Sequence, residues 1–175
     1  CHLDILRLFG PVPAEATSVP ILPYVETVTK ELHRHVNFDG YKARLIADLE
    51  NAEGLLKQHL EKQSEIEEDY FKYRTIRMNY YAVKALKARV YLWADNKAEA
   101  YREAKAVTAV QEQWFPWTER REIMDNTRNP DRIFSSELLF AAYYNAREEI
   151  FTNYFSPTLE PAQVYSPKKH IDDLF

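Results

Sequence analysis

Two histidines have the spacing that a metal site on a β-strand would use. His33 and His35 stand two residues apart, separated by Arg34, and side chains at alternate positions of a strand point to the same side. We interpret this segment as helical, however, and on a helix two residues that far apart face different directions. The sequence therefore predicts structural or solvated histidines here and no metal site.

An acidic run at residues 61–69 supplies the only dense group of carboxylates. Its central members are Glu65, Glu67, Glu68 and Asp69. Glycoside hydrolysis uses two carboxyl groups that face each other across a cleft in different electrostatic surroundings. A contiguous acidic run instead exposes its members together, as in a solvated connector or the first turn of a helix. We therefore expect no catalytic residue and no cofactor, and the chain is not expected to be an enzyme.

The composition is that of a folded domain. The 175 residues are 46% hydrophobic and 29% charged, and they include only three glycines against nine prolines, twelve tyrosines and nine phenylalanines. So few glycines argue against a phosphate-binding loop, and a formal net charge of −4 argues against a nucleic-acid partner. The sequence shows no run of eighteen apolar residues and no signal-peptide pattern. Its one cysteine, Cys1, excludes an internal disulfide.

Periodic apolar residues predict a mostly helical chain in which helices occupy much of residues 24–126. Residues 1–10 read as the last turns of a helix ended by Gly10. A short helix capped by Thr27 or Thr29 is expected next. A long helix then starts at Asn37 or Asp39 and ends near residue 60.

The second half is more varied. A helix is expected over 73–93, another over 98–110, and a polar one near 118–126. Residues 133–145 could be a strand or a buried helix, since periodicity does not decide between them. The part from 127 to 175 is rich in loops and aromatic residues.

The clearest pattern is a helical hairpin over 77–110. The break falls at Ala94-Asp95-Asn96, where Asp and Asn can bond the backbone and cap a new helix. Two apolar stripes on the first helix predict two buried faces, as in a helix between neighbours. We expect Arg89 and Glu137 to need partners because apolar residues surround them. The lysines of the hairpin are expected to form a solvated face; they are Lys84, Lys87, Lys97 and Lys105.

The hairpin resembles a tetratricopeptide unit. Ala88, Tyr91, Ala100 and Val107 match its small, aromatic, small and small-apolar positions. The signature tryptophan and leucine positions of the first helix fall on Lys84 and Lys87, and no proline closes the unit near residue 112.

Four segments in order resemble the SusD/RagB-like nutrient-uptake lipoproteins of the Bacteroidetes outer membrane. They are LDILRLFGPVP at 3–13, DLENAEGLL at 48–56, MNYYAVKALKARVYLWADNKAEAYREAKAV at 78–107 and RIFSSELLFAAYY at 132–144. Because members of this family are much longer, we expect this chain to be one such domain or an internal portion of one. A portion would account for Cys1 at the start. The alternative, a lipid-carrying Cys1, fits poorly with the helical apolar pattern that follows it at once.

The resemblance implies binding without catalysis. Such proteins are lipid-anchored and surface-exposed at the outer membrane, capture glycans or other nutrients, and sit on a TonB-dependent, SusC-like transporter. Contact with the membrane would be made only through the lipid anchor of the full-length protein. In that family the helix pairs frame the fold or pack on the transporter, and sugars bind on the irregular side.

A glycan site needs flat apolar surface and polar groups for hydroxyls, so aromatics outside the clear helices are the candidates. Those residues are Trp114, Trp117, Tyr143, Tyr144, Tyr154 and Tyr165. Of these we select Trp114, Trp117, Tyr143 and Tyr144, with Asn145 as a polar partner. The other interpretation of Trp114 and Trp117 is that they cap the hairpin core.

Two other functions remain open. A helical-repeat adaptor for a protein partner would carry further tandem repeats and an exposed groove. A glycoside hydrolase would need two opposed carboxylates, which the tail would have to supply.

Overall fold

The computed structural model describes residues 1–16, 18–61, 74–124, 130–142 and 144–156. The chain is mostly helical with little strand, as predicted. It divides into two compact units, Cys1–Ala141 and Ala142–Phe175. Tyr73, Tyr143, Tyr165 and the acidic run from Glu65 to Asp69 lie outside the described residues, so the structure does not bear on those predictions.

The first helix, α1 (His2–Phe9), ends where the sequence predicts. The N–H of Gly10 donates to the carbonyl of Leu6 at 2.9 Å, and the backbone then becomes extended. A Cβ on Gly10 would lie 2.6 Å from that same carbonyl oxygen, so the chain leaves the helix only because this residue has no side chain. A 3-10 turn follows at Pro13–Glu15.

Two short strands occupy the region where a short helix was expected. Strand β1 (Leu22–Pro23) pairs antiparallel with β2 (His35–Val36), with Leu22 opposite Val36. Thr29 caps no helix; its Oγ1 accepts a bond from the N–H of Glu31, two residues away, and donates to the carbonyl of the same residue. The prediction of a helix capped by Thr27 or Thr29 was wrong because local side-chain bonding at Thr29 closes a turn of its own.

The long helix α2 (Phe38–Glu61) has the predicted length and start. Asn37 accepts a hydrogen bond from the N–H of Gly40 at 2.9 Å, which places it at the N-cap. One face of the helix is buried through Tyr41, Leu45 and Leu49. Farther along the helix, Leu55 is 65% exposed.

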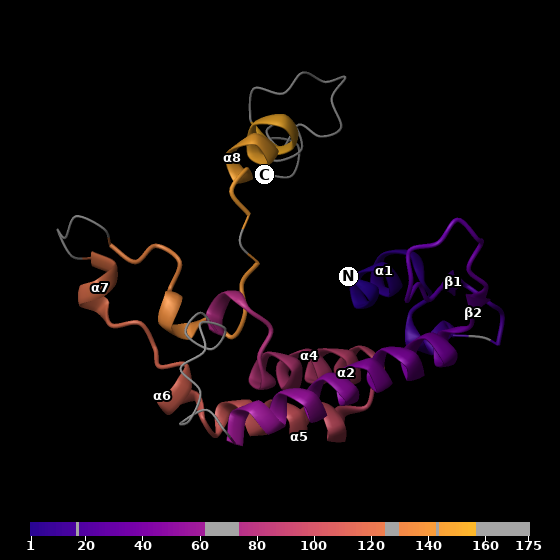
Figure 1. Ribbon diagram of the computed structural model, residues 1–175, viewed down its shortest axis with the longest axis horizontal. Helices are drawn as coiled ribbons and strands as arrows, with labels where there is room; N and C mark the ends of the chain where they lie inside the picture. The colour runs from indigo at the N-terminus through magenta and orange to yellow at the C-terminus, as the bar shows by residue number, and fades with distance from the viewer. Residues whose placement is uncertain (17, 62–73, 125–129, 143, 157–175) are drawn as a thin grey trace. The chain divides into compact units, whose positions relative to one another are not determined.

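The hairpin consists of α4 (Tyr80–Trp93) and α5 (Lys97–Thr108). Helix α4 begins later than the predicted residue 73 because Asn79 caps it, accepting from the N–H of Ala82 at 3.0 Å. A 3-10 turn, Arg74–Ile76, precedes that cap. Helices α2, α4 and α5 lie side by side in Figure 1, with α4 packed against both of the others.

The turn between α4 and α5 is a Schellman motif. The N–H of Asn96 donates to the carbonyl of Tyr91 at 2.8 Å, and the N–H of Asp95 donates to Leu92 at 3.1 Å. Asp95 takes the left-handed conformation, with φ of 58°, at a position usually given to glycine. Asn96 then caps α5 through the N–H of Glu99. The predicted break at residues 94–96 is therefore confirmed.

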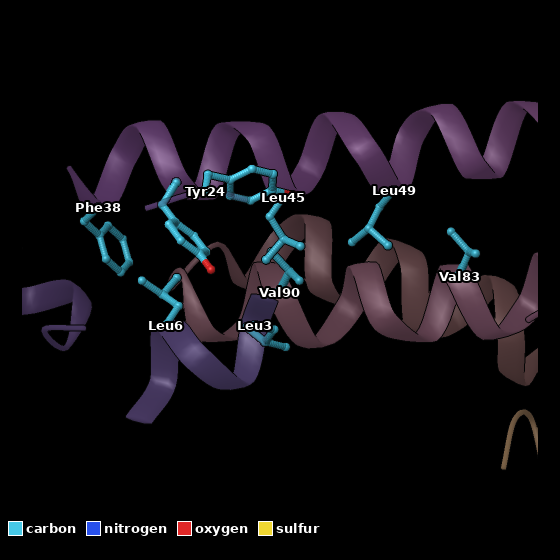
Figure 2. Packing of buried hydrophobic residues seen from close by; sticks show 9 residues of the cluster. Leu3, Leu6, Tyr24, Phe38, Leu45, Leu49, Val83 and Val90 are labelled. Atoms are coloured by element: carbon cyan, nitrogen blue, oxygen red, sulfur yellow. The ribbon is translucent and has the colours of Figure 1, made fainter. Parts of the chain in front are cut away.

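The core of the first unit joins α1, α2 and α4. Figure 2 shows Leu45 and Leu49 of α2 facing Val83 and Val90 of α4, with Leu3 of α1 beside them. These side chains are at most 8% exposed. Burying a Val or Leu side chain contributes about 1.5–3 kcal/mol, so these contacts hold the three helices together.

The rest of the first unit is built from short elements. These are α6 (Gln111–Trp114), α7 (Arg120–Met124) and the 3-10 turn η3 (Ser135–Glu137). Residues 138–141 are neither strand nor helix, so both options for residues 133–145 were wrong. In the second unit, α8 (Arg147–Ile150) continues into a π-helical turn, Phe151–Phe155, where little helix was expected.

Candidate functional site

A loop at residues 115–118 presents Trp117 to solvent. Its first residue, Phe115, is only 3% exposed and packs edge-on against Tyr81 of α4, with 5.9 Å between ring centroids. The N–H of Phe115 donates to the carbonyl of Gln111 at 2.8 Å, and the side-chain amide of Gln111 donates back to the Phe115 carbonyl at 3.0 Å. The start of the loop is thus attached to the hairpin.

The other end of the loop is attached to η3. The N–H of Thr118 donates to Oε1 of Glu137 at 2.9 Å, and the hydroxyls of Thr118 and Ser136 are hydrogen-bonded at 2.8 Å. The expectation that Glu137 needs a partner is confirmed by the first of these bonds. Between the two attachments Trp117 is 72% exposed. We call Trp117, Thr118, Ser136 and Glu137 the Trp117 platform.

Asp131 holds η3 in place. Its Oδ2 accepts bonds from the N–H and the hydroxyl of Ser135, at 2.7 and 2.8 Å, and its Oδ1 accepts from the N–H of Ile133 at 3.0 Å. The hydrogen bonds from the side chain and backbone of Ser135 lower the pKa of Asp131. The carboxylate form, which is the form that can accept all three bonds, therefore predominates near neutral pH.

The platform has the chemistry of a noncovalent sugar site. An exposed indole offers a flat apolar face, and beside it lie the hydroxyls of Thr118 and Ser136. Because the loop is attached at both ends, little conformational entropy is lost when a ligand stacks on the ring.

Trp114, another predicted binding residue, is half-buried. Its ring centroid lies 6.0 Å from that of Tyr81. It packs on the hairpin beside Phe115, so Trp114 and Trp117 occupy different environments although both were candidates.

The remaining predicted residues belong to the second unit, which is described by itself. Tyr144 is 50% exposed and Asn145 is exposed. Tyr143 lies outside the described residues. Farther along this unit the exposed aromatics are Phe151, Tyr154 and Phe155.

The sequence did not predict the most polar feature of the interior, a ring of four charged side chains between α2, α4 and α5. Lys84 lies 2.6 Å from Oε1 of Glu53 and 2.9 Å from Oε2 of Glu103. Lys87 lies 2.6 Å from Oε2 of Glu53 and 3.1 Å from Oε1 of Glu103. Each lysine therefore bridges both carboxylates. We call these four residues the ion ring.

The ion ring is buried. The side chain of Glu103 is 1% exposed and that of Lys87 is 5% exposed. The prediction that Lys84 and Lys87 belong to a solvated face was therefore wrong, whereas Lys97, 80% exposed, and Lys105 do lie in solvent. Burial of such charges is tolerated only because each has partners.

The pKa directions follow from these contacts. Burial would raise the pKa of Glu53 and Glu103, but hydrogen bonds from Lys84 and Lys87 outweigh it, and both values are lowered. Burial would lower the pKa of the lysines, but hydrogen bonds from the two carboxylates outweigh it, and both values are raised. All four groups stay charged near neutral pH. Each of the four side chains is paired with two groups of opposite charge, so we assign the ring a structural role.

A signal for the ring was present in the sequence. Lys84 and Lys87 are three residues apart on a helix whose other residues, apart from Arg89, are uncharged, so the two lysines share one face. Glu103, next to buried Ala100 and Val107 on α5, was the matching acid.

The histidines are placed differently from the prediction. His35 belongs to β2, and His33 precedes it in non-helical backbone, so the helical interpretation of this segment was wrong. His33 is half-buried and His35 is exposed. Among the residues that the structure describes, no three His, Cys, Asp or Glu side chains gather closely enough to hold a metal ion.

Within the described helices, none has both the length and the apolar content needed to cross a bilayer. Comparison of the chain with protein-family models, with curated proteins and with solved structures found no match.

Proposed function

We propose that this chain is the helical scaffold of a SusD/RagB-like nutrient-binding protein and that the Trp117 platform contributes to glycan binding. The observation that carries the proposal is Trp117, 72% exposed on a loop that Phe115 attaches to the hairpin and Thr118 attaches to η3. A large aromatic this exposed and this well supported contributes nothing to the core. An exposed indole on a loop that is attached at both ends offers a flat apolar surface on which a ligand can stack.

The proposed fold is a divergent tetratricopeptide-like hairpin. Its support is the close packing of α4 on α5, with Ala100 and Val107 buried at the positions that the repeat pattern assigns to small and small-apolar residues. Lys84 and Lys87 of the ion ring fall on the positions at which the repeat carries tryptophan and leucine. A hairpin of this kind would hold the platform at a fixed position and take no part in chemistry.

The proposed mechanism is noncovalent capture. A pyranose ring stacks its C–H face on the indole of Trp117 while its hydroxyls bond to Thr118 and Ser136. Tyr144 and Asn145, which belong to the second unit, are proposed as a separate glycan contact of that unit. The bound glycan is then passed to a TonB-dependent, SusC-like transporter at the bacterial surface, where a lipid anchor on the full-length protein would hold it.

A glycan-array screen with the parent protein and with Trp117→Ala and Tyr144→Ala tests this proposal. We expect the parent to bind a defined set of oligosaccharides, and Trp117→Ala to lose the signal while keeping the thermal unfolding curve of the parent. If both variants bind glycan as strongly as the parent does, the proposed site is wrong. Absence of any glycan bound by the parent would reject the function.

A second candidate, a helical-repeat adaptor for a protein partner, is favoured by a different observation. A groove of about 340 Å³ on the hairpin is lined by Ala88, Arg89, Leu92, Lys97, Ala100, Tyr101 and Ala104. Leu92 and Tyr101 are 62% and 66% exposed. Small residues between larger ones let a helix of another protein approach closely. Under this alternative Leu92→Lys would abolish capture of that partner and leave glycan binding unchanged.

A further inference from the structure

A pocket of about 310 Å³ lies between α1 and the C-terminal half of α4. Its lining residues are Leu3, Arg7, Arg89, Leu92 and Trp93. The volume is at the lower end of the range for small-molecule sites. None of these residues belongs to the Trp117 platform or to the ion ring.

The pocket wall carries two guanidinium groups and no carboxylate. The guanidinium carbon of Arg7 lies 5.6 Å from the ring centroid of Trp93, so a cation–π contact holds it against the wall. Its acidic neighbour Asp4 is 3.9 Å away and its side chain is 58% exposed. That distance leaves the guanidinium with hydrogen-bond donors to spare.

Arg89 is the second cation. The sequence predicted that it needs a partner, yet within the described residues it makes no hydrogen bond or ion pair, and it is exposed. It also lines a neighbouring pocket of about 250 Å³ that includes Tyr24 and Asp48. Arg89 also lines the hairpin groove, so it borders three cavities in a chain whose net charge is negative.

The rest of the pocket lining is apolar. Leu3 is 4% exposed and Leu92 is 62% exposed, and Trp93 is the third member. The indole Nε1 of Trp93 is shielded from water and has no acceptor in the described part of the chain.

We propose that this pocket binds the carboxylate of a small organic acid whose body is a ring. The two arginines would hold the carboxylate through paired N–H donors, the geometry in which guanidinium groups bind carboxylates best. Leu3, Leu92 and the indole face would cover the ring. This site is separate from the proposed glycan site, and neither proposal depends on the other.

The test is a titration of the ¹⁵N-labelled protein with benzoate and with glucuronate, followed at the indole N–H resonance of Trp93. That resonance is identified by its absence from Trp93→Phe. Benzyl alcohol and glucose are the matched neutral ligands. Inorganic phosphate is the control for binding of an anion that has no ring. We expect a saturable shift with at least one of the two acids and none with its neutral match, at ligand concentrations up to about 10 mM.

Variants separate a built site from general charge attraction. Arg89→Gln and Arg7→Gln should each weaken binding about tenfold or more, because each removes charge-assisted hydrogen bonds. Arg89→Lys should bind with intermediate affinity since it keeps the charge and loses the paired donors. Arg34→Gln, which removes an exposed arginine from the loop before β2, should bind like the parent.

The thermal unfolding midpoints of all the variants serve as the folding control. No saturable shift with either acid would overturn the proposal. Equal binding of phosphate, or equal weakening by Arg34→Gln, would show a general anion effect and would also overturn it.

Discussion

Lys84 of helix α4 lies 2.6 Å from Glu53 of helix α2, and the two side chains are 14% and 18% exposed. The contact joins two helices that are far apart in sequence, and through Glu103 the same lysine also reaches α5. Each of the three helices therefore contributes charge to one buried ring. Sliding of one helix along another would separate these charges, so we expect the ring to fix the register of the three helices.

Removing one member of the ring should be costly. In Lys87→Met, Glu103 stays buried and loses one of its two lysines, and we expect the free energy of unfolding to fall by about 3 kcal/mol. The control is Lys57→Met, which changes an exposed lysine of α2 and should alter stability by no more than about 0.5 kcal/mol. Urea denaturation followed by circular dichroism gives both values. Equal effects of the two substitutions would mean that the ring contributes nothing.

Replacing the whole ring should be far less harmful than breaking it. In the quadruple variant, Glu53→Leu, Lys84→Leu, Lys87→Leu and Glu103→Leu are combined. We expect its free energy of unfolding to be no more than about 1 kcal/mol below that of the parent, because no charge is left unpaired in the interior. The same urea titration measures it. A quadruple variant less stable than Lys87→Met would show that the ring is a net source of stability and not chiefly a determinant of register.

The ring also predicts a dependence of stability on pH. The pKa values of Glu53 and Glu103 are lowered from the ordinary 4.5, so their contribution is complete above that value and is lost as pH falls through the lower folded-state pKa. The pKa values of Lys84 and Lys87 are raised from 10.5. Their contribution is complete below 10.5 and is lost as pH rises through the higher folded-state pKa.

Unfolding free energies measured across the acid range check this expectation, with the quadruple leucine variant as the reference. The parent should lose more stability than the reference as pH falls below 4.5, the ordinary glutamate value. Parallel curves for the two proteins would contradict the assigned shifts.

The hairpin turn offers a stabilising substitution. Asp95 holds φ at 58°, a conformation that strains most residues and suits glycine. We expect Asp95→Gly to raise the free energy of unfolding by about 0.5–1 kcal/mol, because its exposed pair with Lys97 contributes little. Asp39→Gly, which places glycine in the first turn of α2, should instead lower stability. A loss of stability in Asp95→Gly would mean that its side chain matters to the turn more than backbone strain does.

Local chemistry in the sequence was enough to predict the ends of several helices. Gly10 ends α1, Asn37 caps α2 and Asn96 caps α5, because each acts on backbone within four residues of itself. The start of α4 was placed too early because residues 74–78 contain helix formers, whereas Asn79 both caps the helix and donates to the carbonyl of Leu139 at 2.7 Å. That second bond spans sixty positions and has no local signature.

The Trp117 platform and the ion ring differ in how far the sequence predicts them. Trp117 could be selected as a candidate because it stands in a short segment with a proline and no helical period. The hydrogen bond from the N–H of Thr118 to Glu137 could not be predicted, since it depends on where η3 lies relative to the loop. The prediction for Lys84 and Lys87 was wrong because it overlooked that the two lysines share one helix face. Which acids they meet depends on the positions of Glu53 and Glu103 in space, which the sequence does not give.

Isothermal titration with the glycan that the array identifies is the most direct test of the proposed function. It compares Trp117→Ala with Phe9→Ala, which removes an aromatic ring of matching exposure, 73% against 72%, from helix α1. We expect Trp117→Ala to weaken binding by about tenfold or more, Phe9→Ala to bind like the parent, and both to unfold at the temperature of the parent. Unchanged affinity in a folded Trp117→Ala, or equal weakening in the two variants, would contradict the assignment of the Trp117 platform as the glycan site.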